Sequence, residues 1–269
     1  MAKVTGRLAS TGYQPPKSPE EVELDIVTPT CNRPMELVEQ ATRLGQQMGP
    51  LDRWIVIDDA SEGGAADPAA FVDLLPSRQQ LLMMAMSYVK DQVPGTVNMA
   101  RHIGCSAARP RAWIVELDDH DHLSTGKALD LIRSYICAGH VFLYADTQWY
   151  GPNDSPGQIN HKPNYRPYLL RDRGCPAEGV RAFPSWLYRL VGGYRWHGPL
   201  GVHGCEFPAG DYALYTRMEA FCEGQGFARI PHVLNKQPKI ESSITGTYGT
   251  EQEIMAGMIR KHAKAGTLL

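Results

Sequence analysis

The stretch Ala112-Trp-Ile-Val-Glu-Leu-Asp-Asp-His-Asp-His122 joins an apolar run to a cluster of acidic and imidazole side chains. The apolar run ends at Leu117, and it predicts a strand that is buried on both faces of a sheet. In an open α/β sheet, ligands bind beyond the carboxyl ends of the strands. The polar residues from Asp118 onward are therefore the first candidate for a functional site.

Strands and helices alternate upstream of this stretch. A β-branched run predicts a strand over 22–27, apolar side chains at helical spacing predict a helix over 35–48, and residues 53–57 predict a second strand. A strand, a helix and a strand within about 35 residues form a βαβ unit, which favours a parallel sheet covered by helices. Residues 81–89 are apolar, and their pattern does not distinguish helix from strand.

The alternation continues downstream. The predicted elements are a helix over 96–108, a helix over 127–138, a strand over 140–145, a helix near 211–224 and a helix near 251–265. Residues 150–181 are rich in Gly, Pro and Arg, so they predict a long functional loop or a lid over the site. Four arginines of this region could bind an anionic ligand or could simply be solvated: Arg166, Arg171, Arg173 and Arg181.

Length and composition limit the classes of protein to which the chain can belong. The 269 residues fit one large domain or two small ones, and the 43% hydrophobic content excludes wholesale disorder. The formal net charge of −2 argues against binding duplex nucleic acid mainly through its phosphates. No apolar run reaches the roughly 18 residues of a membrane span, and we recognise no secretory signal. The six cysteines form no CxxC pair, so we expect free thiols and a cytoplasmic protein.

Acidic residues follow three of the predicted strands, at 58–59, 118–121 and 146. Crowded carboxylates repel one another unless a cation or a ligand rich in hydrogen-bond donors neutralises them. An acidic residue at a strand end can also simply cap the next turn or helix, and we favour this interpretation for Asp146. For the polar cluster over 118–121 we favour a metal site. Carboxylate ligands suit Mg²⁺ or Mn²⁺, and the absence of HxxxH and HExxH motifs argues against catalytic zinc.

Three common motifs of nucleotide and ester chemistry are missing from the sequence. The absence of GxGxxG disfavours a dinucleotide-binding Rossmann domain. The absence of GxxxxGK(S/T) disfavours a P-loop enzyme, and the absence of GxSxG disfavours an α/β-hydrolase. The interpretation that is left is a nucleotide bridged to acidic side chains through a divalent metal.

Six short motifs follow one another along the chain. They are Ile26-Val-Thr-Pro-Thr-Cys-Asn-Arg-Pro34, Ile55-Val-Ile-Asp-Asp-Ala-Ser61, Asn98-Met-Ala-Arg101 with Gly104, Val115-Glu-Leu-Asp-Asp-His-Asp121, Leu190-Val-Gly-Gly-Tyr194 and Gly210-Asp-Tyr-Ala-Leu-Tyr-Thr-Arg217. Through these motifs, about residues 23–245 resemble the family 2 glycosyltransferases, which have the GT-A fold. Each motif alone is short enough to arise by chance, whereas six in this order and spacing form a specific signal.

The resemblance implies an α/β fold in which a Rossmann-related mixed sheet, mainly parallel, is flanked by helices. It also implies how the chain is organised: we expect an N-terminal arm over 1–20 and a single GT-A-like domain over 21–269. Within this domain, residues 21–149 would bind the nucleotide sugar and the metal, and residues 150–250 would bind the acceptor. Residues 251–269 would form a C-terminal helix.

The resemblance also assigns roles to particular residues. Those expected to bind the nucleotide are Pro29, Thr30, Asn32, Arg33, Asp58, Asp59, Arg101, Asp118 and Asp119. Asp119, His120 and Asp121 would hold a Mn²⁺ or Mg²⁺ ion, which neutralises the charge that develops on the leaving diphosphate. Those expected to bind the acceptor are Gly192, Gly193, Tyr194 and Trp196.

Family 2 enzymes invert the anomeric centre, so one carboxylate deprotonates the acceptor hydroxyl as it attacks the sugar. Asp211 matches this general base, and Glu206 is a second candidate. Alternatively, Asp211 serves only as a carboxylate at a helix N-terminus, where the macrodipole favours negative charge.

The sequence departs from the family pattern at three places. His120 stands where the family usually has an acidic residue, which leaves open the side chain that touches the metal. Gly210 replaces the acidic neighbour of Asp211. A histidine that is often found near the end of the domain has no clear match around residues 235–243.

The motifs together predict a glycosyltransferase that moves a sugar from a nucleotide-diphosphate donor to an acceptor hydroxyl, on a glycan or another molecule, with inversion and the assistance of a metal. A UDP-sugar is the expected donor, by family frequency alone. Two other functions fit the same motifs: a catalytically silent protein that binds nucleotide sugars or glycans, and a metal-dependent nucleotidyltransferase.

Overall fold

The computed structural model describes the chain in seven segments: 6–62, 67–86, 96–150, 156–173, 179–195, 210–238 and 244–265. Its strands are β1 (Leu24–Thr30), β2 (Arg53–Asp58), β3 (Leu81–Ala85), β4 (Trp113–Glu116), β5 (His122–Leu123), β6 (Phe142–Tyr150), β7 (Pro156–Asn160), β8 (Arg181–Pro184) and β9 (Phe227–Pro238). Its α-helices are α1 (Gly6–Ser10), α2 (Pro34–Gly45), α3 (Thr96–Ser106), α4 (Ala128–Cys137), α5 (Leu169–Arg173), α6 (Ser185–Leu190), α7 (Gly210–Phe221) and α8 (Ile244–Lys264). Short 3-10 helices are η1 (Pro19–Glu21), η2 (Pro68–Ala70), η3 (Val72–Leu74) and η4 (Arg78–Gln80).

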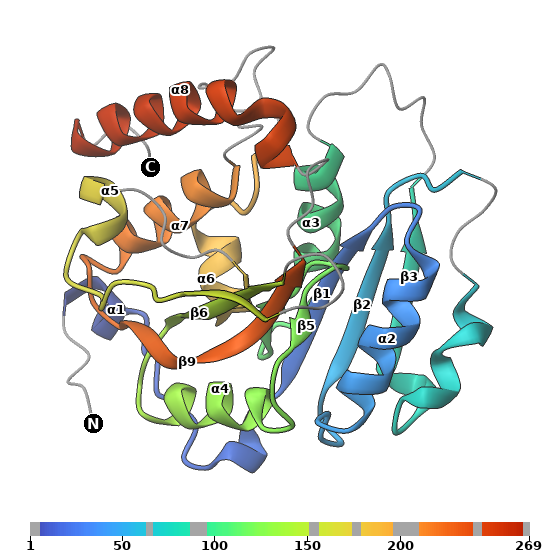
Figure 1. The fold of residues 1–269 in the computed structure, drawn as a ribbon. Helices are drawn as coiled ribbons and strands as arrows, with labels where there is room; N and C mark the ends of the chain where they lie inside the picture. The colour runs from blue at the N-terminus through green and yellow to red at the C-terminus, as the bar shows by residue number, and fades with distance from the viewer. Residues whose placement is uncertain are drawn as a thin grey trace.

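The strands of the described residues form one mixed sheet in the order β3-β2-β1-β4-β8-β6-β9-β5, with β7 paired to β6 (Figure 1). The first four strands of this order are parallel. β8 runs antiparallel to both of its neighbours, β4 and β6. Because β1 pairs with β2 on one side and β4 on the other, the carboxyl ends of these three strands meet at one edge of the sheet.

Helices cover both faces of the sheet (Figure 1). α2 and α4 lie on one face, and α3, α6 and α7 lie on the other, with α8 packed outside α7 and α5. α2 starts at Pro34, and its buried Leu37, Ala41 and Leu44 recur at helical spacing. α3 approaches β1 closely because residue 104 is glycine: a Cβ there would lie 2.5 Å from Cγ1 of Val27.

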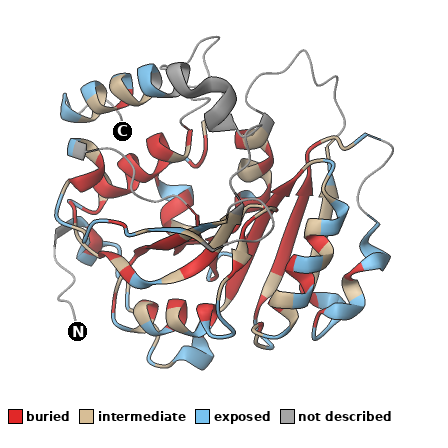
Figure 2. Cartoon of the chain, in the orientation of Figure 1, coloured by how far each residue is buried: buried red, intermediate tan, exposed pale blue. Residues whose placement is uncertain are grey.

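The central strands form the core (Figure 2). All seven residues of β1 are buried, as are all four of β4. This burial on both faces explains why these strands are near-continuous apolar runs in the sequence. Among the described helices, none has both the length and the apolar character needed to cross a lipid bilayer.

Residues 150–181 contain more regular structure than their composition predicts. β7 pairs antiparallel with β6, and α5 follows, so the prediction of one long loop is wrong for these residues. The Pro-Gly-Gln-Ile-Asn sequence of β7 has no alternating pattern, and pairing with β6 determines its extended conformation. The sequence pattern also did not predict β8, α6 or β9.

Part of the expected N-terminal arm packs against the domain. α1 places Leu8 in the core with only 1% of its surface exposed. The ring of Tyr13 lies 5.6 Å from that of Trp186, between centroids. These contacts tie residues 8–13 to the domain.

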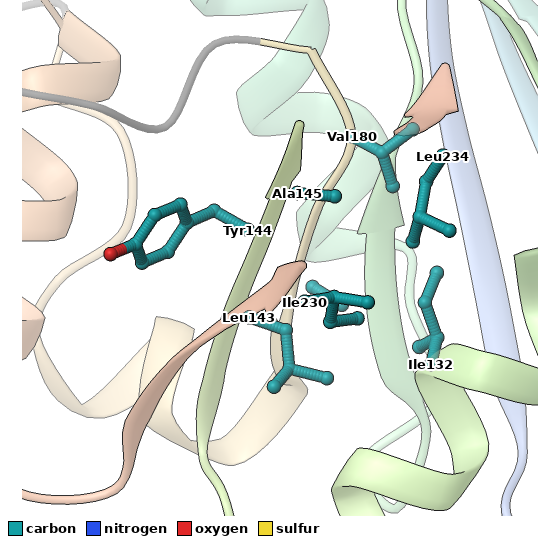
Figure 3. Close-up of a pocket in the computed structure, with 8 residues that line it drawn as sticks. Ile132, Leu143, Tyr144, Ala145, Val180, Ile230 and Leu234 are labelled. Carbon is teal, nitrogen blue, oxygen red and sulfur yellow. The ribbon is translucent and has the colours of Figure 1, made fainter. Parts of the chain in front are cut away.

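A small apolar cavity lies between α4 and strands β6, β8 and β9 (Figure 3). It is lined by Ile132, Leu143, Tyr144, Ala145, Val180, Ala182, Ile230 and Leu234. The ring of Tyr144 points away from the cavity, and its hydroxyl donates a hydrogen bond to the carbonyl of Pro163 at 2.7 Å. The lining offers no charged group for a ligand, so we interpret the cavity as a packing feature.

Candidate functional site

The turns that follow β1 and β2 are joined by their polar side chains. Asp58 accepts hydrogen bonds from the hydroxyl and the N–H of Ser61, at 2.6 and 3.1 Å. The hydroxyl of Ser61 accepts from the N–H of Asn32 at 2.8 Å, and the Asn32 side chain accepts from the N–H of Glu62 at 2.7 Å. Asn32 has a φ of 58°, a left-handed conformation that asparagine tolerates well. Asp58 and Asn32 therefore shape the edge of the site.

Asp59 is part of the same edge. It is 7% exposed, and its N–H donates to the carbonyl of Thr30 at 2.7 Å, which extends the pairing of β1 and β2 by one residue. Pro29 and Thr30 lie within β1 and are buried. Of the residues that the resemblance assigns to the nucleotide, Asp58, Pro29 and Thr30 thus have structural partners in the sheet and its turns.

Arg101 and Asp118 form an ion pair beside this edge. Nη2 of Arg101 lies 2.7 Å from Oδ1 of Asp118. Burial alone would raise the pKa of the Asp118 carboxyl, but Arg101 and Arg181 outweigh burial and hold it well below its usual range. Gly104 makes the pair possible, because the close approach of α3 to β1 brings Arg101 to the carboxyl end of β4.

Asp119 is held by three neighbours. Its Oδ2 accepts from the hydroxyl of Thr30 at 3.1 Å and lies 3.6 Å from Nε of Arg33. Its Oδ1 lies 3.1 Å from Nδ1 of His120. The ends of β1 and β4 are therefore tied together at the point where the resemblance places the nucleotide and the metal.

Asp121 differs from its neighbours. It is fully buried, and neither of its carboxylate oxygens has a hydrogen-bond partner among the described residues. Burial and the nearby Asp118 and Asp119 raise its pKa to about 7, against the attraction of His120. Nε2 of His120 lies 3.8 Å from its Oδ1, which is an ion-pair distance and too long for a hydrogen bond. A buried carboxylate that accepts no hydrogen bond is costly, and a cation would satisfy it.

The residues of the acidic cluster fit a divalent cation that has few protein ligands. In the described part of the chain, no group of three or more His, Cys, Asp or Glu side chains is arranged to hold a metal. Mg²⁺ and Mn²⁺ sites of nucleotide enzymes often use only one or two carboxylates, with water and phosphate oxygens at the other positions. Asp121, whose two oxygens accept no hydrogen bond from the described residues, and the neighbouring Asp119 match that pattern.

His120 connects the acidic cluster to β9. Burial lowers the pKa of its imidazole, but the hydrogen bond with Asp119 and the charges of Asp121 and Asp118 outweigh burial, and the net pKa is raised. Its Nε2 lies 3.2 Å from the side-chain nitrogen of Gln237. Gln237 belongs to none of the six sequence motifs, so no pattern in the sequence marks it.

A buried polar network lies beneath the cluster. Glu116 is 1% exposed, and it accepts hydrogen bonds from Nε of Arg181 at 3.2 Å, from the hydroxyl of Tyr194 at 2.5 Å and from the hydroxyl of Tyr215. Arg181 is 3% exposed, so it is an internal ion-pair partner and not a free cation for an acceptor. The one sequence signal for this network is a charged residue, Glu116, within an otherwise apolar strand.

The network explains two motifs of the acceptor half. Gly192 and Gly193 have φ values of 81° and 60°, which glycine adopts without strain. The buried Arg217 of α7 donates from Nη2 to the carbonyl of Gly193 at 2.6 Å. Tyr194 is only 2% exposed, so it packs in the core and offers no face for stacking an acceptor, contrary to the expectation from the motif. Trp196 lies outside the described residues.

Asp211 lies in the first turn of α7 and accepts a hydrogen bond from the N–H of Tyr212 at 2.7 Å. A Cβ at the preceding Gly210 would collide with the side chain of Asn98 on α3. Asn98 and Arg101 are three residues apart, so they share one face of α3. α7 therefore starts near the Arg101 side of the site, which is compatible with either role of Asp211. Glu206 lies outside the described residues.

Asp146 has a separate, structural role within β6. Arg229 donates to it from Nε at 2.8 Å and from Nη2 at 2.6 Å. Nδ1 of His161 lies 2.9 Å from it, and the N–H of Lys162 donates to it at 2.9 Å. Burial acts to raise the pKa of Asp146, but the bonds from Arg229 and His161 dominate and lower it. Asp146 therefore connects β6 with β9 and with the segment that follows β7.

No protein-family model and no curated protein sequence matches this chain, whereas solved structures match it over most of its length. One is S. aureus TarS 1-349 in complex with UDP-GlcNAc, with a TM-score of 0.63 and 13% identity, covering 88% of this chain and 65% of that one. Another is the mannosyltransferase PcManGT from Pyrobaculum calidifontis in complex with GDP-Man and Mn²⁺, with a TM-score of 0.58 and 12% identity, covering 95% and 72%. The chain thus spans about two thirds of the TarS fragment. The likeness confirms the predicted fold class: this chain has the GT-A fold of nucleotide-sugar glycosyltransferases.

Proposed function

From the GT-A fold of this chain, we propose that it is a glycosyltransferase that moves a sugar from a nucleotide-diphosphate donor to an acceptor hydroxyl with inversion, as the family 2 motifs imply. One observation carries this proposal: the fully buried carboxylate of Asp121 accepts no hydrogen bond from the described residues and has only the imidazole of His120 at 3.8 Å as an ion-pair contact among them, at the sheet edge where GT-A enzymes bind their donors. The same edge carries the ion pair of Arg101 and Asp118. A site so charged is suited to a ligand with phosphates and a cation.

The donor would lie across the ends of β1, β2 and β4. Asp59 lies where a carboxylate can accept hydrogen bonds from a base or ribose. Arg33 and Arg101 are partly exposed, at 29% and 12% of their side chains, and supply positive charge for a diphosphate. TarS holds UDP-GlcNAc and PcManGT holds GDP-Man, so both a UDP-sugar and a GDP-sugar are reasonable donors to test. We favour a UDP-sugar.

Asp119 and Asp121 would hold the divalent cation, which when bound neutralises charge on the leaving diphosphate. His120 stands between them and would orient Asp119 through the bond from Nδ1. This arrangement supports Mn²⁺ or Mg²⁺ over zinc, because the available ligands are mainly carboxylates.

Inversion requires a base that takes the proton from the acceptor hydroxyl as the hydroxyl attacks the anomeric carbon. Asp211 is our candidate, since α7 starts against α3 beside Arg101 and its carboxylate is partly exposed. Its bond from the N–H of Tyr212 engages one carboxylate oxygen, Oδ1. Glu206 is the second candidate.

The test is to incubate the protein with UDP-GlcNAc or GDP-mannose and Mn²⁺ and to measure the release of nucleoside diphosphate. Release from either donor, lost in Asp121→Asn and kept in the exposed control Asp73→Asn, supports the proposal. Release of pyrophosphate from a nucleoside triphosphate would instead identify a nucleotidyltransferase. Donor binding without any turnover in the presence of acceptors would identify a silent binding protein.

A further inference from the structure

The end of β6 presents an exposed tryptophan beside the candidate site. Trp149 is 38% exposed, and its ring has no aromatic or cationic partner among the described residues. From Thr147 to Tyr150 the pairing with β9 is continuous, and Trp149 lies opposite Gln237. Opposite residues of paired strands point to the same face of the sheet, about 5 Å apart. The indole and the amide of Gln237 are therefore neighbours on one face.

Gln237 joins this surface to the acidic cluster. Its side-chain nitrogen lies 3.2 Å from Nε2 of His120, which is directly followed by Asp121 in the chain. β5 continues from this point and pairs antiparallel with β9, opposite Lys236 and Asn235. Trp149 is thus about two strand spacings, roughly 10 Å, from the acidic cluster.

Two backbone features place the Trp149 side chain. The pairing of β6 with β7 shifts register between Gln148 and Tyr150, where two residues of β7, Gly157 and Gln158, lie opposite Trp149. A Cβ at Gly157 of β7 would collide with the carbonyl of Trp149, so glycine is required for this approach. An extra residue in one strand of a pair bends that strand, and such irregularities occur often beside active sites.

On the opposite face of the same strands, an aromatic ring has a cationic neighbour. The ammonium of Lys236 lies 5.1 Å from the centroid of the Tyr150 ring. The two neighbouring aromatic residues of β6 thus differ. Tyr150 contacts Lys236, whereas the side chain of Trp149 points to the opposite face of the sheet, where its ring has no aromatic or cationic partner among the described residues.

We propose that Trp149 and Gln237 form a subsite for a sugar ring of a carbohydrate acceptor. An indole offers a flat apolar face to the C–H face of a pyranose and an N–H to a hydroxyl, and a glutamine amide both donates and accepts hydrogen bonds. This inference rests on the proposed function, since it places the acceptor chain next to the donor site. It replaces Tyr194, which is buried, as the aromatic contact of the acceptor.

The test measures binding of three neutral tetrasaccharides, chitotetraose, maltotetraose and mannotetraose, by ligand-observed NMR with and without UDP. The variants are Trp149→Ala, Trp149→Phe and Gln237→Ala. Leu190→Ala is the control, because Leu190 is an exposed apolar residue, at 54%, on α6. Thermal unfolding of every variant checks that the fold is kept.

We expect the wild type to bind at least one tetrasaccharide, Trp149→Ala to bind it at least tenfold more weakly, and Trp149→Phe and Leu190→Ala to bind within a few-fold of wild type. Release of UDP from UDP-GlcNAc by water, without acceptor, should be equal in wild type and in the control Leu190→Ala. Absence of tetrasaccharide binding in the wild type, or equal binding in Trp149→Ala, overturns the subsite. Failure to release nucleoside diphosphate from either UDP-GlcNAc or GDP-mannose would refute the proposed function alone, because tetrasaccharide binding that depends on Trp149 would still support the subsite.

Discussion

Replacing Asp121 by asparagine should stabilise the metal-free protein at neutral and alkaline pH. Asp121 is fully buried, its oxygens lack hydrogen-bond partners among the described residues, and its pKa is raised to about 7. In the unfolded chain an aspartate titrates near 3.8. Folding therefore retains a proton that the unfolded chain releases between these two values, and stability falls as the pH rises through this interval. At about 1.4 kcal/mol per pH unit, the loss reaches up to about 4 kcal/mol above pH 7.

Asparagine has nearly the same shape and carries no charge, so Asp121→Asn removes this loss. The assay is urea unfolding of wild type and variant in EDTA at several pH values from 4 to 8.5. The two proteins should have similar free energies of unfolding near pH 4. From there to pH 7 the variant should become progressively more stable than wild type, and above pH 7 the difference in the free energy of unfolding should stay constant. Added Mn²⁺ should stabilise wild type at pH 8 and leave the variant unchanged, because only wild type has the carboxylate. Equal stability of both proteins at pH 8 in EDTA, or a larger gain at pH 4 than at pH 8, would refute the reasoning.

Three further predictions concern the base, the placement of α3 and the buried network. If Asp211 is the base, Asp211→Asn should keep donor affinity and lower the rate of sugar transfer by about 10²–10⁴-fold. The rate is measured as product formation, with Glu206→Gln in parallel. Normal turnover in Asp211→Asn but not in Glu206→Gln would move the role to Glu206. Gly104→Ala should lower the free energy of unfolding, measured in urea, by about 1–3 kcal/mol, because its Cβ would lie 2.5 Å from a methyl group of Val27 on β1. Since α3 would then shift and displace Arg101, the variant should also bind UDP more weakly. Unchanged affinity and stability would show that α3 adjusts freely. Tyr215→Phe removes a hydrogen bond to the buried Glu116 carboxylate, and it should lower the free energy of unfolding by about 1.5–3 kcal/mol. A decrease below about 0.5 kcal/mol would mean that this carboxylate does not need the bond.

The buried network also has a consequence for how the two halves of the domain are joined. Glu116 is on β4, immediately before the acidic cluster, and its partners come from β8, from the turn after α6 and from α7. Removing one partner of a buried ion pair leaves an unpaired charge, which costs about 3–5 kcal/mol. One set of hydrogen bonds thus joins β4, which leads into the acidic cluster, to β8, to the turn after α6 and to α7.

Much of the fold is a local property of this sequence. β1, β2 and β4 are buried on both faces and so appear as apolar runs, and α2 has apolar residues at helical spacing after a proline, so periodicity alone predicts these elements. The acidic residues at strand ends and the six motifs also lie in short stretches, which is why a GT-A fold and a site at the carboxyl edge could be inferred. β7, β8 and β9 were not predicted, since pairing with distant strands determines them and their residues carry no alternating pattern.

The sequence by itself determined the fold class, the order of the central elements and the residue types at the carboxyl edge, because these follow from local patterns of apolar and acidic residues. Only the tertiary structure decided which of these residues have partners. It pairs Asp118 with Arg101, leaves Asp121 without a hydrogen bond from the described residues, places Tyr194 and Arg181 in the core and brings Gln237 to His120. These contacts join residues between 17 and 117 positions apart in the chain, and no local pattern records such a distance. The energies of buried charges depend on those contacts, so the chemistry of the site is a property of the folded chain.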